Sequence, residues 1–503
     1  MSREEFDALV TRLQTASERN PRAYNLRVVL LMLLGYGYLI GVLLGAILLT
    51  MGIVALAIGF PNALTIKLGL LLGIASGGLA LALTKALWVR LDAPEGLELK
   101  LTDAPELFSL LDRLRRQFKG PRFHHILLTG DYNASVVQVP RLGVFGWQRN
   151  FLMVGLPLMQ SLSPEEFEAV LAHEFGHLSA NHSRFSGWIY RVRRSWEQAF
   201  EQMYKQQQGG TAILRKFLDG YWPKFNAHAF VLARASEYEA DRCAAEFSGA
   251  PTIARALTRT NLHGALLEQK FWPGVYKRIN TEPVPPANLF SEMGHTLRAP
   301  VDPIDSARWL KTSFTLETNN IDTHPCLKDR LRALNALPPD IHRGQFPVCI
   351  PPPASSAVHH FLGSNAGALT DKLNKTWASN VSSTWEQRRK EVEELNQELS
   401  KTDQGGDAPD AEKIWHKARA LVDRDGDEAA MPVIKEVLLH DPEHAGALLV
   451  SGRYWLEKDN PAGVPLVERA IGSDEILTEA GCNLLYGFYS RTGQRDKLRE
   501  LEH

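Results

Sequence analysis

The 503-residue sequence contains few cysteines and no excess of charge of either sign. Its four cysteines, Cys243, Cys326, Cys349 and Cys482, lie far apart and form no C-x-x-C pair. This pattern argues against a secreted disulfide scaffold and favours a reducing compartment. The formal net charge is −1, so the chain lacks the basic surplus with which proteins bind phosphate backbones, and we expect no nucleic-acid partner.

Charged residues are absent from Val28 to Phe60, a run longer than the about 20 apolar residues that cross a bilayer. Pro61-Asn62 interrupts it, and a second apolar run extends from Leu68 to Leu83. The short connection predicts an antiparallel transmembrane hairpin at residues 28–90, preceded by an N-terminal cytoplasmic helix at 1–27. A cleaved signal peptide does not fit, because the first run is too long and a second follows at once. A buried core hairpin is the remaining alternative.

Glycines recur every four positions in both apolar runs, as Gly37, Gly41 and Gly45 and again as Gly69, Gly73 and Gly77. Small residues let helices approach closely in lipid, so we predict that these two stripes face each other.

Basic residues lie mainly outside the predicted hairpin. Arg19, Arg22 and Arg27 precede it, Lys85 and Arg90 close it, and Lys67 alone lies between the runs. The positive-inside rule therefore places both termini in the cytoplasm. We expect an integral protein of a bacterial inner membrane, with the large domain after the hairpin in the cytoplasm.

Residues 91–345 alternate helical stretches with β-like ones at His125 to Leu128, Ser135 to Val139 and Phe151 to Val154. This alternation predicts one domain in a chain of α+β class that is mainly α. Residues 346–410 are expected to form a linker and a polar helix from Trp377 to Leu399, with Gly405 to Pro409 as a flexible end.

Residues 411–503 carry a weak internal repeat. Gly452-Arg453-Tyr454 recurs as Gly487-Phe488-Tyr489, a turn follows each copy, and Asp425-Gly426-Asp427 fits an earlier turn. The period is close to the about 34 residues of tetratricopeptide repeats, which the segment resembles. A plain helical bundle is the alternative.

The segment from Ser163 to His177 predicts a helix that carries a metal-binding pair. Ser163 can cap this helix, and Glu166 completes a capping box. His173 and His177 are spaced so that both imidazoles project from one face and can chelate one Zn²⁺. Glu174 follows the first histidine, where it can accept a proton from water at the metal.

Such a site requires a third protein ligand. His182 is one residue too close to His173 for the metzincin spacing, and the intervening glycine is missing. Glu237 is the better candidate, because it shares a helix face with Asp241. One carboxylate can then bind zinc while the other accepts a hydrogen bond from a ligating imidazole. The alternative is a solvated charged face with an Arg234–Glu237 ion pair.

The H-E-x-x-H motif at His173, the R-x-x-E-x-x-x-D motif at Arg234 and the apolar spans together resemble the HtpX and CAAX-prenyl-protease family of integral-membrane zinc metallopeptidases. The resemblance covers roughly Leu101 to Leu334 and implies a gluzincin-type, zincin-like domain with one Zn²⁺ per chain. It implies His173, His177 and Glu237 as ligands, Glu174 as the catalytic base, and Asp241 as the hydrogen-bond acceptor behind a ligand.

Two further stretches are similar to the family. Asn133-Ala134 resembles its N-A motif before an edge strand, which would bind substrate as an added strand. Asp322-Thr323-His324-Pro325 with Arg330 resembles its T-H-P…R segment. By this similarity His324 stabilises the oxyanion of the tetrahedral intermediate; packing and helix capping are the alternatives.

The chain also departs from the family pattern. HtpX-type proteins tend to carry further membrane spans after the histidine motif, whereas Trp188 to Ala227 is rich in charged and polar residues here. The repeat-like tail also lies outside the common core.

These features predict a membrane-anchored zinc metalloendopeptidase acting on membrane or misfolded proteins in quality control. Its expected partners are protein or peptide substrates, the lipid bilayer and a protein docked on the C-terminal repeats. A non-catalytic chaperone or assembly scaffold is the alternative, although the intact Glu174 favours an enzyme. A prenyl-protein processing enzyme is a third hypothesis, but two spans leave little material for an intramembrane chamber.

Overall fold

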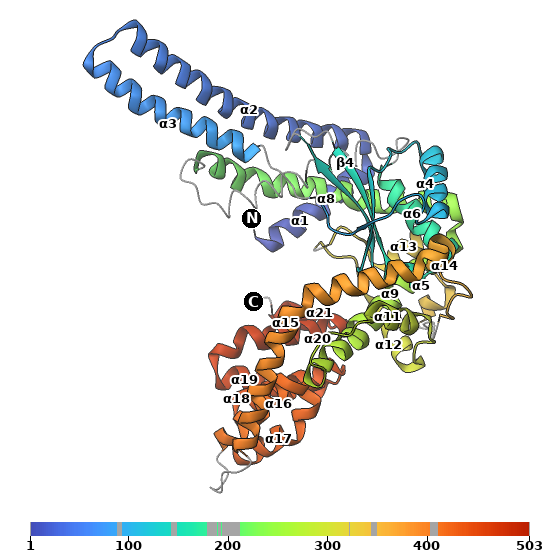
Figure 1. Ribbon diagram of the computed structural model, residues 1–503. Helices are drawn as coiled ribbons and strands as arrows, with labels where there is room; N and C mark the ends of the chain where they lie inside the picture. Colours follow the sequence, from blue (N-terminus) through green and yellow to red (C-terminus); the bar gives the residue numbers. More distant parts are fainter. Residues whose placement is uncertain are drawn as a thin grey trace. The chain divides into compact units, whose positions relative to one another are not determined.

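The computed structural model is mainly helical and contains one four-stranded sheet, in agreement with the predicted class (Figure 1). It describes residues 2–87, 93–141, 148–178, 189, 193, 212–320, 322–343, 350–402 and 411–501. The chain forms two compact units: Met1–Thr260, Glu317–Arg343 and Pro352–Gly367 make the first, and Asn261–Leu316, Gly344–Pro351 and Ala368–His503 the second. Residues 261–316 of the predicted 91–345 domain thus belong to the second unit.

The first unit contains the sheet and the helices around it. Its elements are α1 (Arg3–Arg19), α2 (Pro21–Gly59), α3 (Ala63–Leu87), β1 (Leu97–Glu98), α4 (Pro105–Phe118), β2 (His125–Thr129), β3 (Ala134–Pro140), β4 (Gln148–Gly155), α5 (Leu156–Ser161), α6 (Pro164–Leu178), α8 (Ala212–Ser248), most of α9 (Ala250–Leu266), α13 (Leu327–Ala333) and α14 (Ala357–Leu362). All three predicted strands are present, as β2, β3 and β4.

The strand order of the sheet is β1-β2-β4-β3. Strands β2 and β4 are parallel, with His125 opposite Phe151, and β3 runs antiparallel to β4, with Ala134 opposite Val154. Strand β3 is therefore an edge strand, as predicted, and its other side is unpaired among the described residues. An edge strand can accept a further strand through its free backbone groups.

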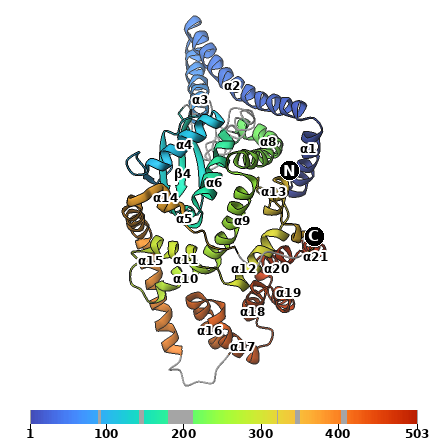
Figure 2. The same cartoon turned by 90° about the vertical axis from the view of Figure 1, so that its right-hand side faces the viewer.

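Helix α6 contacts strand β3 of the sheet and also packs against α4 (Figure 2). Both helices bury apolar side chains. On α6 the buried stripe is Phe167, Leu171 and Phe175, which recur at helical spacing. Because α6 also contacts β3, the open edge of the sheet lies beside the helix that carries His173 and His177.

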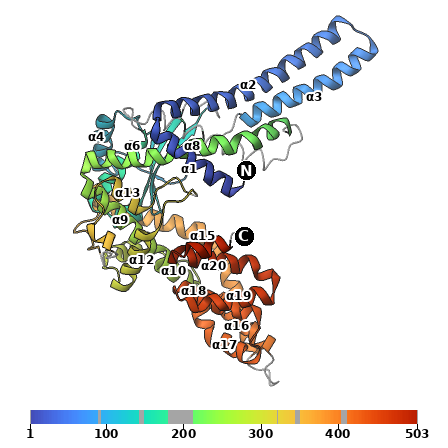
Figure 3. The same ribbon diagram turned by 180° about the vertical axis from the view of Figure 1, so that it is seen from behind.

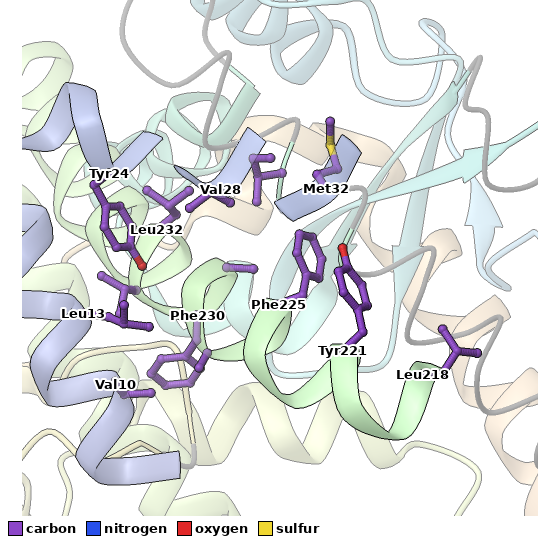
Figure 4. Packing of buried hydrophobic residues seen from close by; sticks show 14 of the residues in the cluster. Val10, Leu13, Tyr24, Val28, Met32, Leu218, Tyr221, Phe225, Phe230 and Leu232 are labelled. Carbon is purple, nitrogen blue, oxygen red and sulfur yellow. The ribbon is translucent and has the colours of Figure 1, made fainter. Parts of the chain in front are cut away.

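A second core joins α1, α8 and the part of α2 from Tyr24 to Ala46 (Figure 4). Val10 and Leu13 of α1 and Tyr24 and Val28 of α2 are buried against Phe225 and Phe230 of α8 and their neighbours. The Tyr24 hydroxyl donates a hydrogen bond to the His228 carbonyl at 2.9 Å. The base of the apolar helix α2 is thereby fixed to the unit that contains the sheet.

Helix α2 leaves this core and runs beside α3, with which it forms an antiparallel pair (Figures 1 and 3). The two helices are connected at Pro61-Asn62, where the sequence predicted the break. The Thr50 and Ser76 hydroxyls are hydrogen-bonded at 2.9 Å. Among the described residues, one helix, α2, is long and apolar enough to cross a membrane. The second span, at Leu68 to Leu83, stays a prediction.

The predicted contact between the two glycine stripes is wrong. Gly69, Gly73 and Gly77 of α3 do face α2, but they meet Ala57, Ile53 and Thr50 respectively. Apart from the adjoining backbone of α2 itself, no atom of the described residues lies within 4 Å of a Cβ built at Gly37, Gly41 or Gly45. The short connection sets this register, since residues equally distant from the turn meet each other. The first stripe lies too far from the turn to reach the second.

The second unit is helical. Its elements are the π-helical turn η3 (Leu267–Phe271), α10 (Trp272–Lys277), α11 (Leu289–Arg298), α12 (Pro303–Thr315), most of α15 (Ala366–Thr402), α16 (Ala411–Asp425), α17 (Asp427–His440), α18 (Ala445–Glu457), α19 (Val464–Ser473), α20 (Thr478–Thr492) and α21 (Arg495–Leu501). Helix α15 contains the predicted polar helix and begins before it, whereas the Gly405 to Pro409 linker lies outside the described residues.

Helices α16 to α21 form three successive helical hairpins (Figure 1). Each hairpin turns through one residue with positive φ: Gly426 (88°), Asp459 (54°) and Gly493 (73°). These residues lie in the three turns that suggested a repeat in the sequence. The hairpins fit a repeat of paired helices, and the tetratricopeptide class itself stays a prediction.

Candidate metal centre

The start of α6 is fixed by the capping box predicted at Ser163 and Glu166. The Glu166 backbone N–H donates to the Ser163 hydroxyl at 3.2 Å, and the Ser163 N–H donates to the Glu166 carboxylate at 3.1 Å. That carboxylate is buried and also accepts two hydrogen bonds from the Arg259 guanidinium, at 2.9 and 3.1 Å. A helix held in this way at its first turn presents His173 and His177 at defined positions.

Helix α8 approaches α6 closely at Gly176. A Cβ at this position would lie 2.7 Å from the Ala240 Cα and 3.1 Å from its Cβ, so the contact requires glycine. Ala240 lies between Glu237 and Asp241 on α8. The glycine inside the histidine motif therefore allows both acidic residues to reach the imidazoles of α6.

The structure brings His173, His177 and Glu237 together, with one donor atom of each within 4.8 Å of the others. The two imidazole Nε2 atoms are 3.2 Å apart. The Glu237 carboxylate oxygens lie 3.6 Å from Nε2 of His173 and 3.5 Å from Nε2 of His177. Tetrahedral zinc with bonds of about 2.0–2.1 Å separates its donors by roughly 3.3 Å, so this group can hold such a metal.

Glu237 Oε2 provides a second test of this fit. It is buried and has no hydrogen-bond partner in the part of the chain that the structure describes. A buried carboxylate oxygen without a partner is unfavourable unless a cation compensates it. Its position beside two Nε2 atoms favours a ligand role.

The other nitrogen of each imidazole is held by a hydrogen-bond partner. His173 Nδ1 lies 2.9 Å from Asp241 Oδ1, and His177 Nδ1 lies 3.3 Å from the Ser236 hydroxyl. Partners at Nδ1 orient the rings and leave the Nε2 lone pairs free for a metal. Asp241 thus lies where the sequence placed it, whereas no sequence signal pointed to Ser236.

Arg330 completes the chain of contacts behind His173. Its guanidinium donates two hydrogen bonds to the Asp241 carboxylate, at 2.8 and 2.6 Å. Asp241 is fully buried, and a bidentate arginine both balances its charge and fixes its plane. From the sequence, Arg330 was noted only as part of the T-H-P…R resemblance, and no role was assigned to it.

The electrostatics of the site favour positive charge at its centre. Burial lowers the pKa of His177 to about 4. Burial also opposes charge on His173, but its hydrogen bond to Asp241 and the nearby Glu237 carboxylate outweigh this and raise its pKa to about 9. The neighbouring imidazoles, against the effect of burial, lower the pKa of Glu237 to about 2. Two ionised carboxylates therefore lie beside the imidazoles, and a divalent cation that binds there would displace the proton of His173.

Glu174 lines the cleft beside this group without belonging to it. Burial raises the pKa of its carboxyl to about 7. The charges of neighbouring groups alter this value less than burial does. A carboxylate with a pKa near neutrality can both accept and return a proton, as a general base requires.

His324 lies at the mouth of the same cleft, and its side chain is 58% exposed. Its Nδ1 lies 2.8 Å from Asp322, and its Nε2 lies 3.6 Å from Glu237. The exposure is inconsistent with core packing. The residue that caps α13 is Cys326, so His324 does not cap that helix either.

Arg234 has a role that the sequence analysis missed. Its guanidinium donates to the Asn319 carbonyl and to the Asn320 side chain, at 3.1 Å for the latter, and so holds the loop that leads to His324. Arg234, Glu237 and Asp241 are all at least 94% buried, since their exposed fractions are 5%, 6% and 0%. The alternative of a solvated charged face with an Arg234–Glu237 pair is therefore wrong.

The cleft has a volume of about 260 Å³ and joins the metal-binding group to the edge of the sheet. Asn133, Ala134, Ser135, Val136 and Gln138 line one side of it. The Asn133 carbonyl accepts a hydrogen bond from the Gly155 N–H at 2.8 Å, which anchors the start of β3. An extended peptide placed along β3 would pass in front of His177 and Glu174.

Other histidines have separate partners. His125 pairs with Glu98 at 2.7 Å, and His228 Nδ1 donates to the Lys224 carbonyl at 2.8 Å. No other group of three or more potential metal ligands occurs among the described residues. His182 lies outside them.

Replacing Arg330 by lysine is expected to weaken metal binding by about 10–100-fold, the usual effect of losing an outer partner of a ligating histidine. A lysine cannot donate the paired bonds that fix Asp241. Zinc affinity by chelator competition measures the effect. Arg332→Lys is the matched control, because Arg332 makes an exposed ion pair with Asp329. Equal affinities of the two variants would contradict the role given to Arg330.

The residues of this site lie in a segment that matches a known protein family. The model of Peptidase family M48 matches residues 123–337. The matched segment contains all the residues of the site described above. No match was found among curated proteins.

Proposed function

We propose that the chain is a membrane-anchored zinc metalloendopeptidase, and the match of residues 123–337 to the model of peptidase family M48 supports the metallopeptidase part of this proposal. Its proposed substrates are membrane or misfolded proteins, cleaved in the course of quality control. The observation that carries the proposal is the convergence of His173, His177 and Glu237 within 4.8 Å, with Glu174 beside them.

Zinc is the proposed metal, held by His173, His177 and Glu237. Two imidazoles and one carboxylate form a donor set that is common in catalytic zinc sites. When bound, zinc supplies a Lewis acid that polarises a carbonyl oxygen and makes water more acidic. The remaining steps of the proposed reaction belong to side chains of the protein.

Glu174 is the proposed general base and acid. Its carboxylate removes a proton from the attacking water and later returns it to the leaving amine. His324 is proposed to stabilise the oxyanion of the tetrahedral intermediate. With Nδ1 on Asp322, a protonated ring would present Nε2–H to the cleft.

The proposed substrate path runs along β3. A bound peptide would add a strand to the open edge of the sheet, because backbone pairing accepts varied side chains. Asn133 and Ala134 start this strand beside the metal-binding group. The helical hairpins of residues 411–503, interpreted as tetratricopeptide repeats, are the proposed docking surface for substrates or a protein partner.

Helix α2 is the proposed membrane anchor, with α3 as a second span. The distribution of arginine and lysine favours cytoplasmic termini and a cytoplasmic catalytic domain. A topology reporter fused after Glu95 is expected to read as cytoplasmic. A reporter that is active only on the outer side of the membrane would reverse the proposed orientation.

Metal removal tests the proposed activity. The full chain, purified in detergent and treated with a chelator, is expected to lose hydrolysis of an unfolded protein and to regain it with stoichiometric Zn²⁺. Metal content and product formation are measured in the same samples. Hydrolysis that persists in metal-free protein would contradict the proposal. Fragments from within the unfolded protein, rather than single terminal residues, identify an endopeptidase.

A further inference from the structure

A cationic pocket lies where α1 and α2 meet, apart from the catalytic cleft. It has a volume of about 550 Å³ and is lined by α1 residues at helical spacing and by α2 residues at the same spacing. The lining residues are Arg12, Thr15, Ala16 and Arg19 on α1, Asn20 between the helices, and Ala23, Tyr24 and Arg27 on α2.

Three exposed arginines, Arg12, Arg19 and Arg27, line this pocket, and no acidic residue does. None of the three forms an ion pair with a residue that the structure describes, whereas most other arginines of the first unit pair with a carboxylate or carbonyl. Three unpaired guanidiniums around one concave surface attract a polyvalent anion, and arginine is well suited to phosphate.

The walls of the pocket are held in place by the core beneath it. Val10 and Leu13 of α1 and Tyr24 of α2 are buried against α8 (Figure 4). The Asn20 side chain accepts a hydrogen bond from the Ala23 N–H at 3.1 Å and caps α2 at the junction. The arginines are therefore presented by a fixed pair of helices rather than by a flexible tail.

The pocket adjoins the apolar surface of α2. Charged residues end at Arg27, and exposed leucines begin at once, with Leu26, Leu30, Leu33 and Leu34 each more than half exposed. If α2 enters a bilayer here, the arginines lie at the level of the headgroups and the leucines at the level of the acyl chains. A ligand with a phosphate at one end and hydrocarbon at the other fits the arginine-lined pocket and the apolar surface of α2 that follows it.

We propose that the pocket between α1 and α2 binds the phosphate of an anionic phospholipid, whose acyl chains lie along α2. Phosphatidylglycerol represents this class of ligand. The lipid would hold the catalytic unit at a fixed height and orientation on the membrane surface. This inference rests on the membrane anchoring in the proposed function, but not on peptide hydrolysis.

Lipid selectivity of the full chain in neutral detergent tests the proposal. Native mass spectrometry is used to titrate phosphatidylglycerol and phosphatidylcholine that carry the same acyl chains. Wild type is expected to bind phosphatidylglycerol at least about tenfold more tightly. Each arginine near a membrane surface strengthens binding of an anionic lipid roughly fivefold. The affinity of Arg12→Gln/Arg19→Gln/Arg27→Gln for phosphatidylglycerol should therefore fall on the order of a hundredfold.

The matched control is Lys100→Gln/Arg116→Gln/Arg122→Gln, which removes the same charge from exposed sites of the same unit. It is expected to bind phosphatidylglycerol as wild type does. If the triple pocket variant fails to fold, Arg19→Gln alone is expected to bind about fivefold more weakly. If the pocket and control variants lose equal affinity for phosphatidylglycerol, the proposal of a specific site between α1 and α2 is overturned.

Two further measurements, phosphate competition and alkaline extraction, distinguish which of the proposals has failed. If inorganic phosphate displaces phosphatidylglycerol completely, the pocket recognises free phosphate and the lipid proposal is overturned. If alkaline extraction releases the chain from membranes, both the anchoring and the lipid proposal fail. If the chain stays in the membrane but binds the two lipids equally, the lipid proposal fails alone. Loss of hydrolysis with intact selectivity would refute only the peptidase function.

Discussion

Glu174→Gln is expected to lower kcat for peptide hydrolysis by about 10²–10⁴-fold, the usual contribution of a general acid–base group. Glutamine has nearly the same size and shape but cannot accept a proton from water. Glu174 lies outside the group formed by His173, His177 and Glu237, so the metal content should stay at the wild-type level. The measurement combines single-turnover kinetics on an unfolded protein with metal analysis.

The matched control for this change is Glu168→Gln. Glu168 is on the same helix but pairs with Arg113 at 2.8 Å, away from the cleft. Its loss should leave kcat unchanged, because such a surface ion pair contributes at most about 1 kcal/mol to stability. Hydrolysis at the wild-type rate in Glu174→Gln would remove the base from the mechanism. Loss of metal in that variant would instead give Glu174 a ligand role.

Glu237→Ala is expected to weaken zinc binding by more than the about 10–100-fold that follows loss of an outer partner. Two imidazoles alone leave zinc one protein ligand short of a catalytic site. Activity at limiting zinc should fall in parallel with occupancy. Chelator competition measures the affinity, and excess zinc should restore part of the activity if the fold is intact.

Thermal unfolding gives a second readout for Glu237→Ala. Zinc that binds only the folded state raises Tm of the wild type, and this rise should largely disappear in the variant. Glu246→Ala is the control, because Glu246 is an exposed carboxylate on the same helix. A variant that keeps both the zinc-dependent rise in Tm and the wild-type affinity would show that the third ligand is another residue.

Local features of the site could be read from the sequence because they depend on neighbours along the chain. The capping box of Ser163 and Glu166, the common face of His173 and His177 and the break at Pro61-Asn62 each follow from helix or turn geometry over a few residues. Strands β2, β3 and β4 were predicted for the same reason. The structure contains all of these features.

Contacts between distant segments were harder to predict, and both the wrong prediction of facing glycine stripes and the missed role of Arg234 arose there. The sequence shows two glycine stripes but not which residues of the opposite helix they meet, since register depends on distance from the turn. It shows Arg234 near Glu237 on one helix but not that Arg234 instead contacts the loop at Asn319. Burial of this helix face, and with it the partners of its charges, depends on packing between elements.

The sequence by itself determined the chemistry that the chain can carry: two imidazoles on one helix face, a neighbouring carboxylate, and an apolar run that lacks charge. Helix periodicity and the bilayer's thickness are enough to specify these features. Tertiary structure decided which atoms meet. The close approach of α8 at Gly176 places Glu237 beside both Nε2 atoms, and Arg330 reaches Asp241 from a separate helix. Such distances depend on how the whole core packs, and no short segment contains that information.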